Sequence, residues 1–262
     1  MKSLPRLIGG LVTSFCLCSL LPSVAGADAP ADVKLPAAKE VIAKYIQAVG
    51  GREAILKTAA LRAKGKYEIP NMSVSGQVEM VRAKPNRQLV KISIEGFGQT
   101  SIGFDGKVGW MIDPMVGPKL MDGKMLDQTR EDAEFYSQLH DETNYRTLEV
   151  VGKVVFEGQE CYQMKVVWKS GREGTEFFDL KTGLIAGTTL TQETAQGQIQ
   201  VVNRFTEYKK FGDLTQPTRM VQKMGEIEQV LTLTSFSYDP VPETEFEQPE
   251  AIKALLKGQP AK

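Results

Sequence analysis

The stretch that decides the fold is "SVSGQVEMVRAKPNRQLVKISIEGFGQTSIGFDGKVGWMID", residues 73–113. Apolar and polar residues alternate through most of it, which is the period of a half-buried β-strand. The breaks contain residues that favour tight turns, such as Asp105-Gly106. The stretch therefore predicts four short antiparallel strands in succession, with "LRAKGKYEI" (residues 61–69) as a fifth strand before them.

Residues 146–238 contain seven further segments with the same alternation. Turn residues separate them, among them Gly158, Gly171, Gly183 and Gly212. An open sheet of about twelve strands rarely stays flat, because twist makes it curl or split. We therefore expect a mainly β protein: a single strongly curved antiparallel sheet of about 11–12 strands, which is a half-open β-barrel.

Two segments have helical rather than strand periodicity. In residues 35–60 the apolar side chains recur at helical spacing (Val41, Ile42, Tyr45, Ile46 and Val49), and Gly50-Gly51 ends the helix. Residues 122–140 lie between the two strand series and carry a partly apolar stripe that includes Met125, Phe135 and Leu139. We expect both helices to cover the concave face of the sheet.

The first 27 residues have the pattern of a cleaved secretory signal. Lys2 and Arg6 precede an apolar run over residues 7–21, which ends in the small residues Ala25-Gly26-Ala27. The run is shorter than the roughly 20 apolar residues of a spanning helix. We expect a signal peptide over residues 1–27 and a single periplasmic domain over residues 28–262, a monomer with no membrane span after signal removal.

Charge and reactive side chains exclude several classes of function. The mature chain would have 30 Lys and Arg (the chain's 32 less Lys2 and Arg6) against 32 Asp and Glu, so nucleic-acid binding is not expected. His140 is the single histidine of the sequence, which rules out a zinc site with several imidazoles. Signal removal leaves Cys161 alone, and we expect it to be buried on a strand. No cofactor is expected.

Three phrases resemble a known family: "GFDGKVGWMIDP" (103–114), "FFDLKTGLIAGTTL" (177–190) and "FTEYKKFGDLTQPTRM" (205–220). Together with the order of helices and strands, they resemble the periplasmic lipoprotein-sorting chaperones and their relatives. The resemblance covers residues 36–240 and consists of turn phrases and strand order, not of catalytic motifs. It implies a half-open β-barrel with helices across its mouth. Well-known members shield lipoprotein acyl chains between two membranes, and others bind different amphiphiles.

Residues 104–125 hold four methionines and Trp110 in a stretch broken by glycines and prolines. Three interpretations compete: packing of a core corner, a thioether site for Cu(I), and an adaptable surface for a lipid-like ligand. Met111 and Met115 are four residues apart, but Pro114 between them disfavours the helix that would bring both onto one face. A place at the mouth of a half-barrel favours the ligand surface.

We therefore predict a non-enzymatic periplasmic carrier that binds lipid or lipoprotein acyl chains. Such binding needs no catalytic group, because each buried methylene contributes about 0.8 kcal/mol. A one-residue error in strand parity would exchange inward and outward side chains. The candidate binding residues are Val78, Met80, Ile92, Ile94, Ile102, Phe104 and Trp110 on the strands, with Met115, Met121, Met125 and Phe135 on the lid side.

Two alternatives come from other classes of function. The same half-barrel would serve as an envelope sensor or interaction module if its open edge or convex face bound a protein partner. A hydrolase would depend on His140, Asp141 and a serine such as Ser137, and nothing in the sequence indicates an activated nucleophile.

Overall fold

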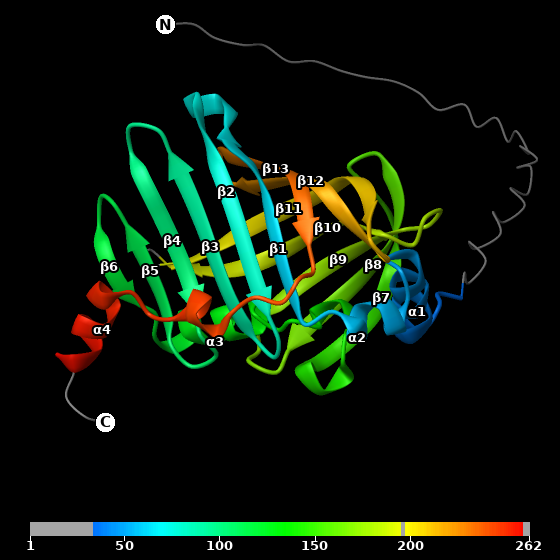
Figure 1. Cartoon of the computed structure of the whole chain (residues 1–262). Helices are drawn as coiled ribbons and strands as arrows, with labels where there is room; N and C mark the ends of the chain where they lie inside the picture. Colours follow the sequence, from blue (N-terminus) through cyan, green and yellow to red (C-terminus); the bar gives the residue numbers. More distant parts are fainter. Residues whose placement is uncertain (1–33, 195–196, 259–262) are drawn as a thin grey trace, which may run out of the picture. The chain divides into compact units, whose positions relative to one another are not determined.

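The computed structural model describes residues 34–194 and 197–258 (Figure 1). Leu35–Lys262 forms one compact unit. The predicted signal peptide, residues 1–27, lies outside the described residues. Within the described ranges, no helix is both long and apolar enough to cross a membrane.

The described residues form one antiparallel sheet of thirteen strands in the order β6-β5-β4-β3-β2-β1-β13-β12-β11-β10-β9-β8-β7. The mainly β, strongly curved sheet expected from the sequence is thus confirmed. The strands are β1 Ala60–Ile69, β2 Val74–Ala83, β3 Arg87–Ile94, β4 Gly98–Phe104, β5 Gly109–Asp113, β6 Gly117–Leu120, β7 Tyr145–Phe156, β8 Gln159–Trp168, β9 Glu173–Asp179, β10 Ile185–Thr194, β11 Gly197–Phe211, β12 Leu214–Met224 and β13 Ile227–Ser237.

The predicted count of about 11–12 strands was too low by the short strand β6. Its sequence, "GPKL", has no alternating pattern and contains Pro118, which argues against a strand in the middle of a sheet. β6 pairs only with β5 and forms one edge of the described sheet, where a residue without an N–H is tolerated. The seven strands predicted for the second series are all present.

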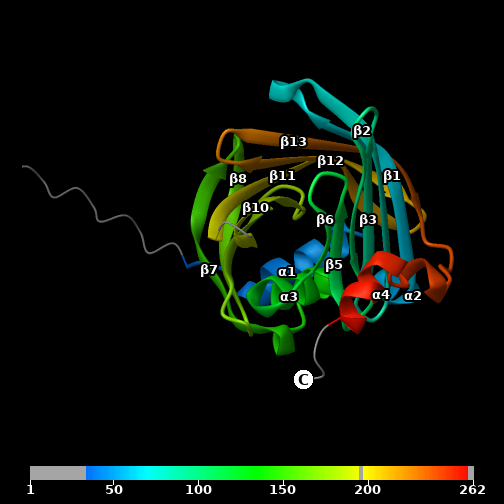
Figure 2. The ribbon, with the colours of Figure 1, turned by 90° about the vertical axis from the view of Figure 1, so that its left-hand side faces the viewer.

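The two edge strands, β6 and β7, do not pair, so the sheet curls without closing. Figure 2 shows helices α1 (Ala38–Ala48) and α3 (Gly123–Asp132) inside the curve. Helix α1 ends just before Gly50-Gly51, as the sequence predicted, and the short helix α2 (Arg52–Lys57) follows these glycines. Helix α3 belongs to the segment that joins the two edges of the sheet.

The predicted helix over residues 122–140 ends early, at Asp132. The Arg82 guanidinium donates hydrogen bonds to the backbone carbonyls of Asp132 and Glu134, both at 2.8 Å. These bonds satisfy carbonyls that a longer helix would use internally. The chain continues as two 3-10 turns, Ser137–Leu139 and Glu142–Asn144, with His140 in the left-handed region at φ 48°.

Helix α1 packs on the inner surface of the sheet and contributes to the main hydrophobic core. Its buried side chains, Val41, Ile42 and Tyr45, pack with Met164, Val166 and Phe178 of strands β8 and β9. The helical spacing read from the sequence places these residues on one stripe, and that stripe faces the inner surface of the sheet.

A C-terminal segment covers the outer surface, which the sequence did not lead us to expect. It contains a 3-10 turn, Glu243–Phe246, and helix α4, Glu250–Lys257. Phe246 is buried against Ala60, Val81 and Leu89, while α4 packs on β6. The Arg62 guanidinium on β1 bonds Glu245 at 3.2 Å and ties the segment to the sheet. The expectation that helices would lie only on the concave face was therefore incomplete.

Trp110 belongs to this outer layer. It pairs in register with Gly103, and a Cβ built on Gly103 would overlap the indole ring. Only a residue without a side chain leaves room for the ring to lie flat across β4. Trp110 is 1% exposed, so it is part of the packed outer core.

The substitution Gly103→Ala should lower the free energy of unfolding by about 1–3 kcal/mol, because the added methyl group must displace the Trp110 ring. Gly152→Ala is the matched control, since a Cβ there meets no atom within 4 Å. Urea unfolding followed by circular dichroism measures both. Equal effects of the two substitutions would contradict the packing described for Trp110.

Candidate ligand-binding face

Strand register places six of the predicted binding residues on one face. Val78 pairs with Ile92, and Gly76 pairs with Ile94. Val90, the partner of Met80, also pairs with Ile102, and Gln88 pairs with Phe104. Paired residues in an antiparallel sheet project to the same side. The shared residues are therefore Val78, Met80, Ile92, Ile94, Ile102 and Phe104.

This is the inner face of the sheet. Arg82, two residues beyond Met80 on the same side of β2, reaches the end of α3 inside the curve. The apolar surface continues across β1 onto β12 and β13, through Tyr67, Leu231 and Met220. Its members all lie on strands, and many are half-buried: Ile69, Met80, Val90, Ile92, Ile94, Met220, Leu231 and Phe236. We call this cluster the inner apolar face.

The other predicted binding residues do not lie on the strands of this face. Trp110 projects to the outer surface, one residue out of phase with Ile102 and Phe104. Met115 is 85% exposed in the turn between β5 and β6. Met125 lies half-buried on α3, and Phe135 follows α3 and contacts Tyr136 with ring centroids 5.1 Å apart.

Met121 joins the inner surface to α3. Its side chain is close to Gly109 of β5, where an added Cβ would lie 3.1 Å from the sulfur. The Thr129 hydroxyl of α3 donates to the same sulfur at 3.1 Å. Met115 and Met121 lie at opposite ends of β6, so the four methionines of residues 104–125 are not arranged as one thioether cluster. In the described residues, no group of three or more His, Cys, Asp or Glu is placed to hold a metal.

Polar contacts hold α3 across the curve of the sheet. From one side, Arg82 of β2 binds carbonyls at its C-terminal end. From the other, the Arg172 guanidinium lies 2.6 Å from Asp132 and donates to the Thr191 carbonyl of β10 at 3.2 Å. The Gln128 side chain accepts a hydrogen bond from the Glu193 N–H at 2.9 Å.

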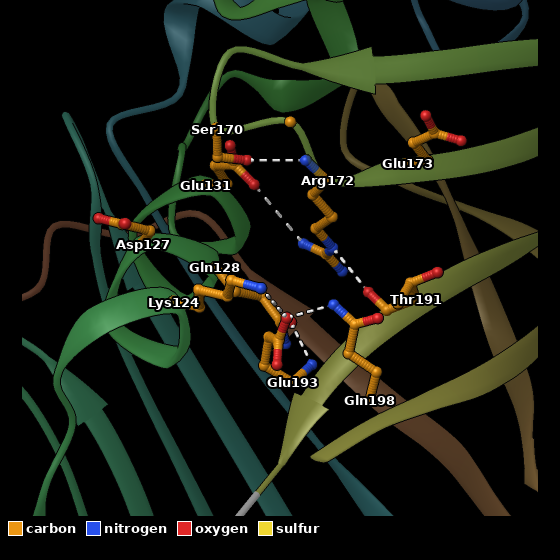
Figure 3. Close-up of a pocket in the computed structure, with 11 residues that line it drawn as sticks. Lys124, Asp127, Gln128, Glu131, Ser170, Arg172, Glu173, Thr191, Glu193 and Gln198 are labelled. Carbon is orange, nitrogen blue, oxygen red and sulfur yellow. Dashed lines mark hydrogen bonds and ion pairs between the residues drawn. The ribbon is translucent and has the colours of Figure 1, made fainter.

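Figure 3 shows the pocket that lies beside these polar contacts, between α3 and strands β9 and β10. Its volume is about 380 Å³. Four acidic side chains and two basic ones, Lys124 and Arg172, line it, and Lys124 lies 3.5 Å from Glu193. The lining is too polar to sequester an acyl chain, so this pocket belongs to the attachment of α3.

A larger cavity of about 700 Å³ lies between the α3–β7 connection and strands β8 and β9. The buried pair His140–Glu176 lines it, with Nε2 2.7 Å from the carboxylate, and so do Tyr45, Tyr145 and Trp168. The other ring nitrogen, Nδ1, lies 3.2 Å from the Gln138 carbonyl. Both ring nitrogens thus face acceptors, which favours the doubly protonated imidazolium.

The pKa of His140 reflects this arrangement. Burial lowers the pKa, but the nearby Glu176 charge, its hydrogen bond and the Gln138 carbonyl together raise it above its ordinary value. Burying two charges costs desolvation free energy, and in this pair the attraction between the imidazolium and the carboxylate offsets that cost.

The hydrolase arrangement considered from the sequence is not formed. The partners of His140 are Glu176 and Gln138, not Asp141 or Ser137. Asp141 accepts bonds from the N–H and hydroxyl of Thr143 instead. Cys161 is fully buried on β8, as expected, and burial raises the pKa of its thiol to about 11.

The sequence reading missed Glu176, Arg82 and Arg172. Glu176 had a detectable signal: in "GTEFFDL" it shares strand parity with Phe178, so a carboxylate interrupts an apolar inward series. The two arginines had no such signal, because their partners on α3 are 40 to 52 residues away in the sequence.

Solved structures show where this architecture recurs. A LolA superfamily protein from Nitrosomonas europaea has a TM-score of 0.55 at 11% identity, covering 82% of this chain and 99% of its own. A DUF1329 family protein from Desulfovibrio piger has a TM-score of 0.55 at 12% identity, covering 80% and 97%. A putative outer membrane lipoprotein-sorting protein domain from Vibrio parahaemolyticus has a TM-score of 0.51 at 12% identity, covering 84% and 99%.

The chain has the same fold as these three proteins. The resemblance seen in the sequence is confirmed at the level of the fold, and identities this low show the fold alone. No protein-family model matches the sequence, and neither does any curated relative.

The free energy of unfolding should fall as the pH rises from about 6 through the folded-state pKa of His140. A raised folded pKa stabilises the protein fully below the unfolded value of about 6.5, and that contribution is lost above the folded value, at about 1.4 kcal/mol per unit of difference. Urea unfolding between pH 5.5 and 9 measures the slope.

His140→Gln removes the titrating group and should flatten this slope. Because the sequence has no other histidine, no second imidazole confuses the comparison. Wild-type protein that becomes more stable from pH 6 to pH 8 would contradict the assignment of a charged pair.

Proposed function

We propose that this chain is a non-enzymatic carrier of the cell envelope that binds lipid or lipoprotein acyl chains on the inner apolar face. The observation that carries the proposal is the half-buried state of that face. Eight aliphatic, methionine and aromatic side chains pack on the cluster without being fully covered. A soluble protein leaves a contiguous apolar surface partly open where it binds a partner or ligand.

The residue types on this face suit chains of varied shape. Met80 and Met220 are flexible and polarizable, so they adapt to ligands that differ in length and unsaturation. Helix α3 lies across the same side of the sheet and would shield a bound chain from water. Each buried methylene contributes about 0.8 kcal/mol, so burial alone supplies several kcal/mol for a long chain.

The fold that the chain shares with the solved structures supports this proposal. Two of those structures are named as a LolA superfamily protein and as a putative outer membrane lipoprotein-sorting protein domain. Export to the periplasm, by way of a signal peptide over residues 1–27, is part of the same proposal.

A second candidate function uses the edge of the sheet. Strand β7 is twelve residues long, and in the described residues it pairs only with β8. Two of its side chains, Val151 and Val155, are exposed. A strand from an envelope protein partner would extend the sheet at this edge, as in the sensor or interaction module considered above.

A fluorescent fatty acid should bind the protein and be displaced by long-chain better than by short-chain lipids, because transfer free energy grows with every methylene buried. Ile92→Glu should weaken probe binding at least tenfold, since it puts a charge on the inner apolar face. Fluorescence titration measures the dissociation constants.

Ser93→Glu is the matched control, because the next residue of β3 projects to the opposite face. It should leave probe affinity unchanged. Circular dichroism confirms that both variants are folded. Equal affinity of Ile92→Glu and wild type would remove the inner face as the binding site, and a stable complex with an envelope protein but no lipid would favour the β7 edge.

A further inference from the structure

Five of the nine large apolar side chains that are exposed among the described residues lie in or directly beside hairpin turns at one end of the sheet. Met115 is 85% exposed, Val116 74%, Phe97 64%, Met72 59% and Ile227 41%. These five belong to four turns: β1–β2, β3–β4, β5–β6 and β12–β13. We call them the hydrophobic rim.

The order of strands puts these four turns at the same end. Along the neighbours β6-β5-β4-β3-β2-β1-β13-β12, every second hairpin connection lies at one end of an antiparallel sheet. The turns also meet in pairs: the Asn71 side chain donates to the Glu226 carbonyl at 3.0 Å, and a Cβ on Gly98 would lie 3.2 Å from Pro114. Figure 1 shows the β1–β2 turn at the end of the sheet opposite α3.

In three of the four turns, backbone N–H groups are hydrogen-bonded within the turn. The Asp113 carboxylate accepts from the N–H groups of Met115 at 2.8 Å and Val116 at 3.2 Å. The Phe97 N–H donates to Ile94, and the Ser73 N–H to Pro70. Turns whose N–H groups are paired lose less on leaving water, which is a requirement for entering lipid.

We propose that the hydrophobic rim docks on the surface of a lipid bilayer, with its apolar side chains inserted among the headgroups. Isolated protrusions on separate turns suit a fluid surface, whereas a protein partner needs a continuous complementary patch of about 800 Å². Glu95, Asp113 and Glu226 accompany the rim, so attraction to anionic lipid is not what holds it. Apolar insertion into a zwitterionic bilayer is the mode that fits.

The rim is continuous with the inner apolar face. Ile69 and Ile94 of that face stand directly before the β1–β2 and β3–β4 turns. Docking therefore places the membrane at the end of the face that α3 does not occupy, and an acyl chain would pass between bilayer and protein without crossing water.

Flotation with phosphatidylcholine vesicles tests the rim. The protein should float with the vesicles, and Phe97→Ser combined with Met115→Ser should lower the partition coefficient at least tenfold, because two large apolar side chains lose their burial in lipid. Val155→Ser is the matched control: Val155 is 72% exposed but lies on β7, away from the rim, so its loss should change nothing.

A fluorophore on the rim gives a second measurement. Phe97→Cys labelled with an NBD group should brighten when vesicles are added, while Val155→Cys labelled in the same way should not; the native Cys161 is buried and stays unlabelled. Absence of flotation, or flotation that the paired rim substitutions leave unchanged, overturns the proposal. So does a dimer that the rim substitutions dissociate, which would make the rim a contact between copies of the chain.

This test is separable from that of the carrier function. Rim variants should bind the fatty-acid probe in solution as tightly as wild type, because the inner apolar face is intact. Ile92→Glu should float normally although it binds the probe weakly.

Discussion

The structure depends on one constraint: the two edges of the sheet, β6 and β7, never pair, and a single segment of chain must cross between them. Helix α3 makes that crossing and is fixed from both sides by arginine, Arg82 of β2 and Arg172 near β9. These charge-assisted bonds link β2 and the start of β9 to α3 across the opening. A flat sheet of this size would expose its inner face to water.

Within this frame the inner surface divides into two parts. Under helix α1, the side chains of β7 to β10 are buried in a close-packed core that includes Phe178 and Met164. On β1 to β3 and β12 to β13, apolar side chains remain half-buried. The same strand alternation therefore gives a packed core beneath α1 and a half-buried apolar surface on the other strands.

Period-two alternation was enough to find twelve of the thirteen strands and the shared face of Val78 to Phe104. It failed where local pattern carries no information. β6 has no alternation, and α4 is stabilised by Ile252, buried against the outer layer, rather than by a long periodic stripe. Trp110 was assigned to the wrong side because the β4–β5 hairpin pairs Phe104 with Gly109, so the inward residues are even-numbered on β4 but odd-numbered on β5. The arginines that anchor α3 contact residues 40 to 52 positions away in the sequence, so no short stretch of sequence contains both partners.

The way α3 is held bears on how a ligand would enter. Its fully buried residues are Gln128 and Thr129, whereas those of α1 are Val41, Ile42 and Tyr45. Displacing α1 would expose a large apolar area, at a cost of several kcal/mol. Displacing α3 exchanges its polar contacts for contacts with water, which costs far less per contact. Local opening takes the route that exposes least apolar surface. Of the two helices inside the curve, α3 should therefore be displaced more readily than α1, whose apolar side chains form part of the core.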